Sequence, residues 1–305
     1  MTTLPSNDKV IALSSRKSYR SAIGGRLPLP ERRPTRIISI TSGKGGVGKT
    51  NIVANLGYQL SRAGNRVLIL DADLGLGNLD ILLGLAPRFN LSHVLMGEKR
   101  IRDIIIEGPG RLNILPAASG IQELTQLTGD QKMGMLYELD RLLDAIDILL
   151  IDSAAGISSN VLDFSVTAQE IMVVVTPEPT SITDAYALMK VLSTRYAEKT
   201  CRLIVNQVSS EQEGREIFRQ LNLVAQKFLA INMEYFGCIL QDENLVRCVK
   251  QQQIVSQAYP ESIATKGFRN LARRTRALPA MKTLQGDHQL FWDHIFKSGA
   301  ISSKS

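Results

Sequence analysis

A glycine-rich loop between a predicted strand and a predicted helix constrains the fold of this chain more than any other feature. Residues 37–51 read IISITSGKGGVGKTN, an apolar run followed by glycines and then by helical periodicity. They match the phosphate-binding pattern G-x-x-x-x-G-K-[ST] in the strand-to-helix context that the pattern requires. Glycines can adopt the positive φ angles that turn successive N–H groups inward at a helix N-terminus. We therefore expect the following residues to bind a nucleotide: Gly43, Lys44, Gly45, Gly46, Val47, Gly48, Lys49, Thr50 and Asn51.

Two lysines flank the glycines of this loop. Lys49 is expected to contact the β- and γ-phosphates, and Thr50 to offer its hydroxyl to Mg²⁺. Lys44 is not needed to cradle phosphate, and with it the stretch KGGVGKT resembles the deviant Walker loop of the MinD/ParA group of ATPases. The resemblance implies that Lys44 crosses a two-fold interface and completes the partner's active site. On this interpretation the protein hydrolyses ATP only as a homodimer, with Lys44 and Lys49 as catalytic residues.

Acidic residues follow two predicted strands. The strand 66–70 leads into Asp71 and Asp73, and the apolar run 147–152 ends in Asp152. Carboxylates spaced i, i+2 at the carboxyl end of a parallel strand project to the side where open α/β sheets bind ligands. We expect Asp71, Asp152 and Thr50 to organise Mg²⁺, and the resemblance implies that Asp73 positions the attacking water. The alternative is that Asp71 and Asp73 cap the next short helix.

The order of the predicted elements indicates the fold class. Strands alternate with helices along most of the chain, which predicts a doubly wound α/β domain with a mainly parallel sheet and right-handed crossovers. The strand 202–206 ends in Asn206, which in this family reads the adenine edge and would select ATP over GTP; the alternative is a loop asparagine. We expect an arm at 1–35, a P-loop ATPase domain at 36–280 and a C-terminal helix and tail at 281–305.

The composition of the chain and the distribution of its charge limit the kinds of protein that it can be. The net charge of +7 is concentrated in residues 1–36, which hold eight basic and two acidic residues. Such an arm can attract an acidic partner or can be a solvated leader. The three cysteines form no C-x-x-C pair, which argues against an iron–sulfur or zinc site. No apolar run approaches the roughly 20 residues of a membrane span, and we expect a cytoplasmic protein.

The C-terminal quarter has two features that a partner could recognise. The predicted helix 262–277 is basic, which would suit non-specific DNA, although an ordinary solvated face is the simpler interpretation. The helix expected near the C-terminus has one broad face that could lie at a membrane surface. This face holds Met281, Leu284, Phe291 and Ile295 and, more loosely, Trp292 and Phe296. The alternatives are a helix packed on the body and a protein-docking face.

Three further stretches of the sequence resemble one particular branch of the MinD/ParA group. DADLGLGNLDILLG, NLSHVLMGE and RLNILPAASG are similar to the flagellar branch of the family, FlhG (FleN). This implies a regulator of flagellar number or placement whose partners include a flagellar regulator or the SRP-type GTPase FlhF. The N-terminal motif D-Q-A-x-x-L-R, through which FlhG stimulates FlhF, does not occur in residues 1–35. Two rivals stay open: a MinD-type division-site ATPase and a ParA-type DNA-partition ATPase.

Overall fold

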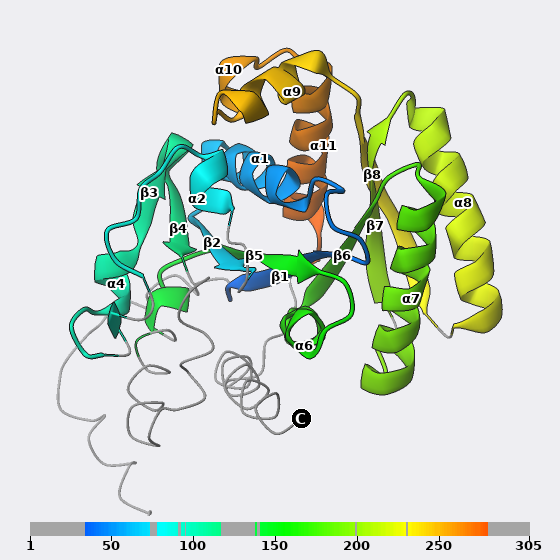
Figure 1. Ribbon diagram of the computed structural model, residues 1–305, viewed down its shortest axis with the longest axis horizontal. Helices are drawn as coiled ribbons and strands as arrows, with labels where there is room; N and C mark the ends of the chain where they lie inside the picture. The colour runs from blue at the N-terminus through cyan, green and yellow to red at the C-terminus, as the bar shows by residue number, and fades with distance from the viewer. Residues whose placement is uncertain are drawn as a thin grey trace, which may run out of the picture. The chain divides into compact units, whose positions relative to one another are not determined.

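The computed structural model describes residues 34–73, 78–90, 93–94, 96–116, 138, 141–198, 200–229 and 231–279. In these residues the strands form one eight-stranded sheet in the order β3-β4-β2-β5-β1-β6-β7-β8 (Figure 1). Only β3 runs antiparallel to its neighbour in this described sheet. The strands are β1 (Arg36–Ser42), β2 (Val67–Ala72), β3 (Ile106–Gly108), β4 (Leu112–Pro116), β5 (Ile148–Ala155), β6 (Glu170–Val175), β7 (Thr200–Val208) and β8 (Asn232–Leu240).

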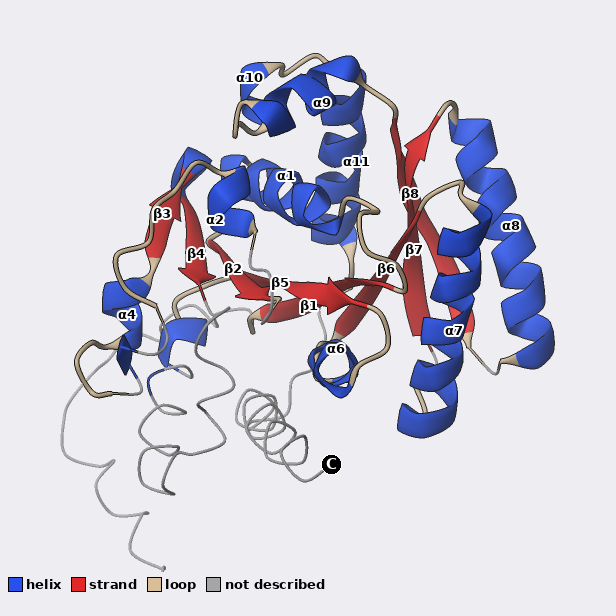
Figure 2. Cartoon of the chain, in the orientation of Figure 1, coloured by secondary structure: helices blue, strands red, loops and turns tan. Residues whose placement is uncertain are grey.

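Helices cover both faces of this sheet (Figure 2). The α-helices are α1 (Lys49–Arg62), α2 (Leu79–Leu82), α4 (Ile101–Ile104), α6 (Ser159–Val166), α7 (Pro179–Tyr196), α8 (Glu211–Phe228), α9 (Glu243–Lys250), α10 (Val255–Ala258) and α11 (Ile263–Ala277). A 3₁₀ turn, η1 (Pro109–Arg111), joins β3 to β4. None of the helices in the described part of the chain is long and apolar enough to cross a membrane.

Successive side chains of each strand point to opposite faces, which explains why the inner strands are apolar throughout. Every residue of β2 and of β6 is buried. One face packs on α1 and α11, with core residues that include Ile40, Ile52, Ile69, Ile204 and Phe268. The other face packs on α7 and α8 beside β6 and β7, with core residues that include Val173, Leu188, Leu203, Val205 and Leu221. The doubly wound, mainly parallel fold predicted from the sequence is confirmed.

Polar caps fix the beginnings of three helices in the second half of the chain. The Ser210, Asp242 and Ser262 side chains accept N–H groups in the first turns of α8, α9 and α11, respectively. Such caps satisfy donors that otherwise have no partner in the helix. At its far end, α11 is held by Arg36 of β1, whose guanidinium donates to the carbonyl oxygens of Thr275 at 2.8 Å and Leu278 at 2.9 Å.

Before β4 the chain forms α4 and the antiparallel strand β3, neither of which the sequence predicted. Residues 138 and 141–143 are helical, and the chain turns at 144–145 before β5. Residues 1–33 of the expected arm, residues 74–77 after Asp73, and the helix and tail expected at 281–305 lie outside the described residues.

Candidate nucleotide site

The phosphate loop connects β1 to α1 at the carboxyl edge of the sheet. Gly46 has φ 75° and Gly48 has φ 89°, both in the left-handed region that favours glycine. The Ser42 hydroxyl donates to the Lys44 carbonyl oxygen at 2.7 Å, and α1 begins with the Ile52 N–H donating to Gly48 at 3.0 Å. The loop therefore ends at a helix N-terminus, where N–H groups favour an anion.

At two positions of the loop, neighbouring atoms lie so close that only glycine, which has no side chain, can be accommodated. A Cβ on Gly43 would lie 2.1 Å from the carbonyl oxygen of Asp184 in α7. A Cβ on Gly48 would lie 2.4 Å from Nδ2 of Asn206 in β7. The loop is thus wedged between α7 and the end of β7. Gly45 and Gly46 have no such neighbour, so their side of the loop is open.

Two buried carboxylates lie side by side at the ends of β2 and β5. Asp71 and Asp152 are partners in the register of these parallel strands, with exposed fractions of 4% and 2%. Asp71 accepts the N–H groups of Asp73 at 3.2 Å and Leu79 at 3.4 Å. Burial raises the pKa of Asp71 to about 6. Burial, and then the charge of Asp71, raises the pKa of Asp152 to about 7, so this pair favours a nearby cation.

Lys49 and Thr50, the first residues of α1, face these carboxylates. Burial lowers the pKa of the Lys49 ammonium, while Asp152 and Asp73 act in the opposite direction. The Thr50 hydroxyl is a hydrogen-bonding partner of Asp152. The fold therefore brings the predicted phosphate lysine, the predicted metal hydroxyl and the predicted metal carboxylates into one cluster. Asp73 lies at the edge of this cluster and is half-buried. It directly precedes residues 74–77, which lie outside the described part of the chain.

The cluster fits a magnesium ion held together with phosphate. Oδ1 of Asp152 is buried and has no hydrogen-bonding partner in the structure, so this oxygen can serve as a ligand to a cation. No group of three or more His, Cys, Asp or Glu side chains in the described ranges could hold a metal alone. Mg²⁺ commonly binds through one or two carboxylates together with substrate phosphates and water. Thr50, Asp71 and Asp152 are suited to that role.

Lys44 lies at the opposite, exposed side of the loop. Its ammonium forms an ion pair with the Glu178 carboxylate and donates to Oγ1 of Thr180 at 2.9 Å. Both partners belong to the beginning of α7 in the same chain. Lys44, which was predicted to act on the partner subunit's nucleotide, therefore contacts residues of its own chain in this structure. The motif search missed Glu178 and Thr180, and their only sequence signal was the cap-like stretch PEPTS before a helix.

A pocket of about 650 Å³ opens next to the loop, between the ends of β7 and β8 and helix α9. Asn206 is buried there, and its Nδ2 donates to the Val47 carbonyl oxygen at 2.7 Å. Its Oδ1 is buried without a partner in the structure, so it can accept a hydrogen bond from a ligand. Residues 241–243, at the beginning of α9, also line this pocket, as does Asn51 of α1.

Sequence reasoning missed part of the pocket wall. Val246 and Val249 of α9 are 57% and 38% exposed and face the pocket beside Gln207. Gln207 has φ 58°, a left-handed conformation that is uncommon for a residue other than glycine. The available signal was two valines at helical spacing, on a different part of α9 from the buried Cys248. Exposed apolar side chains at such a place suit a flat, partly apolar ring such as a purine.

Three comparisons with known proteins agree with this geometry. A sequence family described as an AAA domain matches residues 35–204. Antiactivator FleN of Pseudomonas aeruginosa is 40% identical over 270 residues, which cover 88% of this chain and 96% of FleN. The flagellum site-determining protein YlxH of Helicobacter pylori is 35% identical over 239 residues, covering 78% and 81% of the two chains.

Solved structures show the same architecture. The cell division protein MinD of Aquifex aeolicus superposes with a TM-score of 0.63 at 27% identity, covering 81% of this chain and all of the other. MinD of Pyrococcus horikoshii, whose structure was solved with Mg-ADP, gives a TM-score of 0.63 at 26% identity and covers 82% of this chain.

Proposed function

This chain belongs to the MinD/ParA family of P-loop ATPases, and we propose that it is an ATP-dependent dimerising switch that regulates flagellar number and placement. The observation that carries the proposal is the juxtaposition of Asp71 and Asp152 beside Lys49 and Thr50. Two buried carboxylates with raised pKa values favour a cation, and the adjacent loop favours an anion. Mg-ATP supplies both.

Each group of the site has a separate task in ATP hydrolysis. The loop amides and Lys49 hold the phosphates, and Asn206 with the α9 valines holds the base. Thr50, Asp71 and Asp152 hold Mg²⁺, which would neutralise charge that develops on the phosphate oxygens. Asp73 orients the attacking water from the end of β2. Its backbone N–H is fixed by Asp71, so the metal ligand and the water-orienting residue share one turn.

Lys44 makes hydrolysis depend on a second subunit. Its cis contacts with Glu178 and Thr180 are exposed, and exposed ion pairs contribute only about 0–1 kcal/mol. A partner's ATP, with several negative charges, can therefore compete for this lysine. We infer that Lys44 exchanges Glu178 for the partner's phosphates when two ATP-bound subunits close. A cationic residue supplied in trans accelerates other nucleotide hydrolases by about 10³–10⁵.

The flagellar role rests on the relatives. FleN is named an antiactivator and YlxH a flagellum site-determining protein, and both match most of this chain. We therefore propose a flagellar regulator or FlhF as a partner of the ATP-bound dimer. The aromatic stretch Phe291–Phe296 gives it reversible contact with the inner face of the cell membrane. Pairing strengthens such contact because two weak anchors act together.

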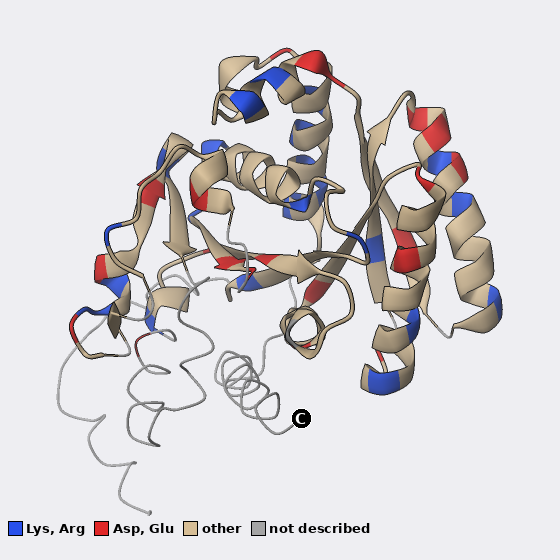
Figure 3. Cartoon of the chain, in the orientation of Figure 1, with Lys and Arg blue, Asp and Glu red and all other residues tan. Residues whose placement is uncertain are grey.

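DNA binding is the second candidate function, because α11 is strongly basic. It carries Lys266, Arg269, Arg273, Arg274 and Arg276 and no carboxylate (Figure 3). A one-signed surface of this kind binds polyanions without sequence preference. On this alternative the protein is a partition ATPase, and ATP promotes its binding to duplex DNA. The matches to MinD proteins also leave a division-site role as a competing assignment.

Light scattering and kinetics test the switch directly. The intact protein should be monomeric with Mg-ADP and dimeric with Mg-ATP, and its hydrolysis rate per subunit should rise with protein concentration. Equal mass in both nucleotides, or a rate per subunit independent of concentration, would contradict the proposal.

Sedimentation with anionic liposomes separates the proposed roles. The intact chain should pellet with lipid only with ATP, whereas a chain that ends before Phe291 should stay in solution. Retention on duplex DNA with ATP, and no pelleting with lipid, would favour the partition function.

A further inference from the structure

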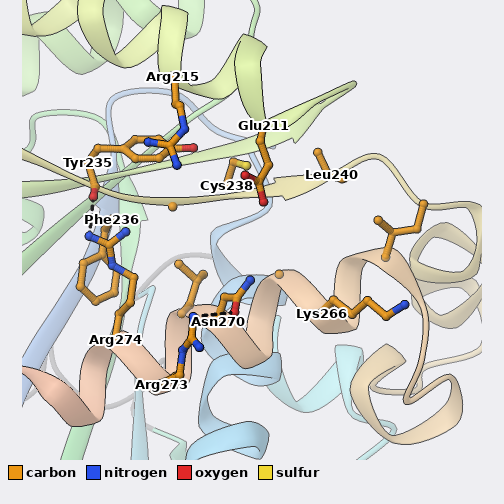
Figure 4. A pocket seen from close by; sticks show the side chains of 14 residues that line it. Glu211, Arg215, Tyr235, Phe236, Cys238, Leu240, Lys266, Asn270, Arg273 and Arg274 are labelled. Carbon is orange, nitrogen blue, oxygen red and sulfur yellow. Dashed lines mark hydrogen bonds between the residues drawn. The ribbon is translucent and has the colours of Figure 1, made fainter.

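A groove at the β8 edge of the sheet has no role in the proposed switch. It runs between α8 and α11 along β8, has a volume of about 520 Å³ and is shown in Figure 4. Arg215 and Glu211 enter it from α8, and Lys266 and Arg273 enter it from α11. The groove therefore has two helical walls and a strand as its floor.

The charge of the groove is predominantly positive. Arg215, Lys266 and Arg273 are exposed, and Glu211 is the one carboxylate among the lining residues. Arg274 also lines it, but its guanidinium donates to the Tyr235 carbonyl oxygen at 2.8 Å and is thus committed to β8. Cations stand on both walls, so a ligand lying along the groove would meet positive charge on each side. An anionic ligand is favoured.

The floor of the groove is a sheet edge. β8 is the last strand of the sheet, and within the described residues no strand pairs with its outer side. Edge strands accept an additional extended chain when the edge is left accessible. Apolar side chains also line the groove, with Leu240 half-buried and Ile263 52% exposed. The surface thus combines an edge strand that pairs with no further strand in the described residues, apolar contacts and flanking cations.

We propose that this groove binds an extended, acidic segment of a partner protein. Successive side chains of an extended segment point to opposite sides, so its carboxylates reach Arg215 on one wall and Lys266 and Arg273 on the other. Apolar residues of the segment lie against Leu240 and Ile263. Nucleic acid is disfavoured because Glu211 and the apolar side chains would face phosphates. A small anion is disfavoured because Arg215, Lys266 and Arg273 are exposed rather than buried.

The groove shares structure with the base pocket. Leu240 lines both cavities. Beyond it, the Asp242 carboxylate accepts the N–H groups of Asn244 in α9 and of Ala264 in α11, both at 2.9 Å. One side chain therefore connects the helix beside the base to the helix that forms a groove wall. Binding at either cavity can alter affinity at the other, and any such coupling is reciprocal.

Selection from a peptide library tests the proposal. The probe is a library of ten-residue peptides with glutamates at adjacent positions, so that carboxylates point to both sides of an extended segment. It is displayed against the intact protein with Mg-ATP, beside a library with glutamine at the same positions. Glutamate peptides should be enriched, and their affinity should fall at least tenfold in the Lys266→Glu/Arg273→Glu variant and in Arg215→Glu. The matched control is Arg219→Glu/Arg276→Glu, which changes charge on the same helices outside the groove and should leave binding intact.

Hydrogen exchange then locates the bound peptide. Amides of β8 should exchange more slowly with a selected peptide bound, while those of α7 should not change. Enrichment of glutamine peptides to the same degree would overturn the proposal. So would equal loss of binding in the groove and control variants, or unchanged exchange in β8. Tighter binding of a 20-base-pair duplex through the same three cations would assign the groove to DNA instead.

Discussion

The two sides of the phosphate loop hold charge in opposite ways. On one side Asp71 and Asp152 are buried next to each other with raised pKa values, and a ligand must be bound for both to be ionised at low cost. On the other side Lys44 and Glu178 form an exposed ion pair that already satisfies both groups. The first arrangement is poised to bind a cation, whereas the second is poised to exchange partners.

This difference separates stability from catalysis. A buried charge that lacks a counter-ion costs several kcal/mol, so the carboxylate side should dominate the stability of the nucleotide-free protein. An exposed pair contributes about 0–1 kcal/mol, so the Lys44 side should hardly affect stability. The order should reverse for hydrolysis, because a cation in trans acts on the transition state. Variants at the two sides test whether the two properties are divided in this way.

Loss of Lys44 should have the largest effect. Lys44→Ala is expected to reduce ATP hydrolysis by about 10³-fold or more, as for other residues supplied in trans. Its melting temperature should change little, since the lysine is exposed in the described structure. Steady-state phosphate release and thermal unfolding measure the two quantities. Lys227→Ala, which removes an exposed lysine of α8 away from the loop and the base pocket, is the control. A tenfold or smaller loss would contradict a catalytic role in trans.

Removal of the buried charge at Asp152 should affect stability next most strongly. Its pKa in the folded protein is about 7, against 3.8 as the ordinary value. Between these values the unfolded chain is ionised while the folded protein retains the proton, so the free energy of unfolding falls as pH rises, and levels off above pH about 7. One pKa unit corresponds to about 1.4 kcal/mol, which predicts a loss of roughly 2–4 kcal/mol.

Denaturant unfolding at pH 5 and pH 8 measures this loss in the nucleotide-free protein. Asp152→Asn should flatten the pH dependence and should be at least as stable as the natural protein at pH 8, yet it should lose Mg-dependent hydrolysis. Mg-ATP should restore the natural protein's stability at pH 8 but not alter the variant to the same extent. An equal pH dependence in both proteins would show that Asp152 does not carry the buried charge.

The local parts of this site could be predicted from sequence, and its long-range contacts could not. The loop and its helix follow from one continuous pattern, and Asp152 follows an unmistakable buried strand. The facing of Asp71 and Asp152, in contrast, depends on how β2 and β5 align. The Lys44–Glu178 pair joins residues 134 positions apart. Neither of these long-range contacts produces a periodic pattern in the sequence from which it could be predicted.

Secondary structure shows the same limit. β3 has only three residues, and its pairing with β4 depends on η1, where Gly110 has φ 71° and Arg111 has φ 66°. Three residues are too few for an alternating pattern. The apolar face of α9 was likewise overlooked, because its two valines acquire meaning only when β7 and β8 place a pocket beside them.

Asn206 tests the pocket that lies between the two sides of the loop. Asn206→Ala should weaken ATP binding about tenfold, the value expected for one buried hydrogen bond and one unsatisfied carbonyl. The preference for ATP over GTP should fall, because Oδ1 can no longer accept from the base. Calorimetric titration with non-hydrolysable analogues of each nucleotide measures both effects. Asn232→Ala, at an exposed position of β8, is the control. Unchanged discrimination between the nucleotides would remove Asn206 from base recognition.

Loosening the cis contact of Lys44 should give the smallest effect and the most direct test of partner exchange. Glu178→Gln keeps the size of the side chain but removes the charge that competes with the partner's phosphates. Because an exposed pair is worth about 0.2–1 kcal/mol, ATP-dependent dimerisation should strengthen by no more than about fivefold for each of the two pairs released. The hydrolysis rate at low protein concentration should rise accordingly, and the effect should shrink in high salt, which screens exposed pairs.

Analytical ultracentrifugation with Mg-ATP measures the dimer affinity, with Glu216→Gln on α8 as the matched exposed control. The sign of the change decides between two roles for Glu178. Stronger dimerisation means that Glu178 restrains Lys44 in the single subunit. Weaker dimerisation means that Glu178 holds Lys44 in the orientation that the partner's site requires, so that the exposed pair persists in the dimer rather than exchanging.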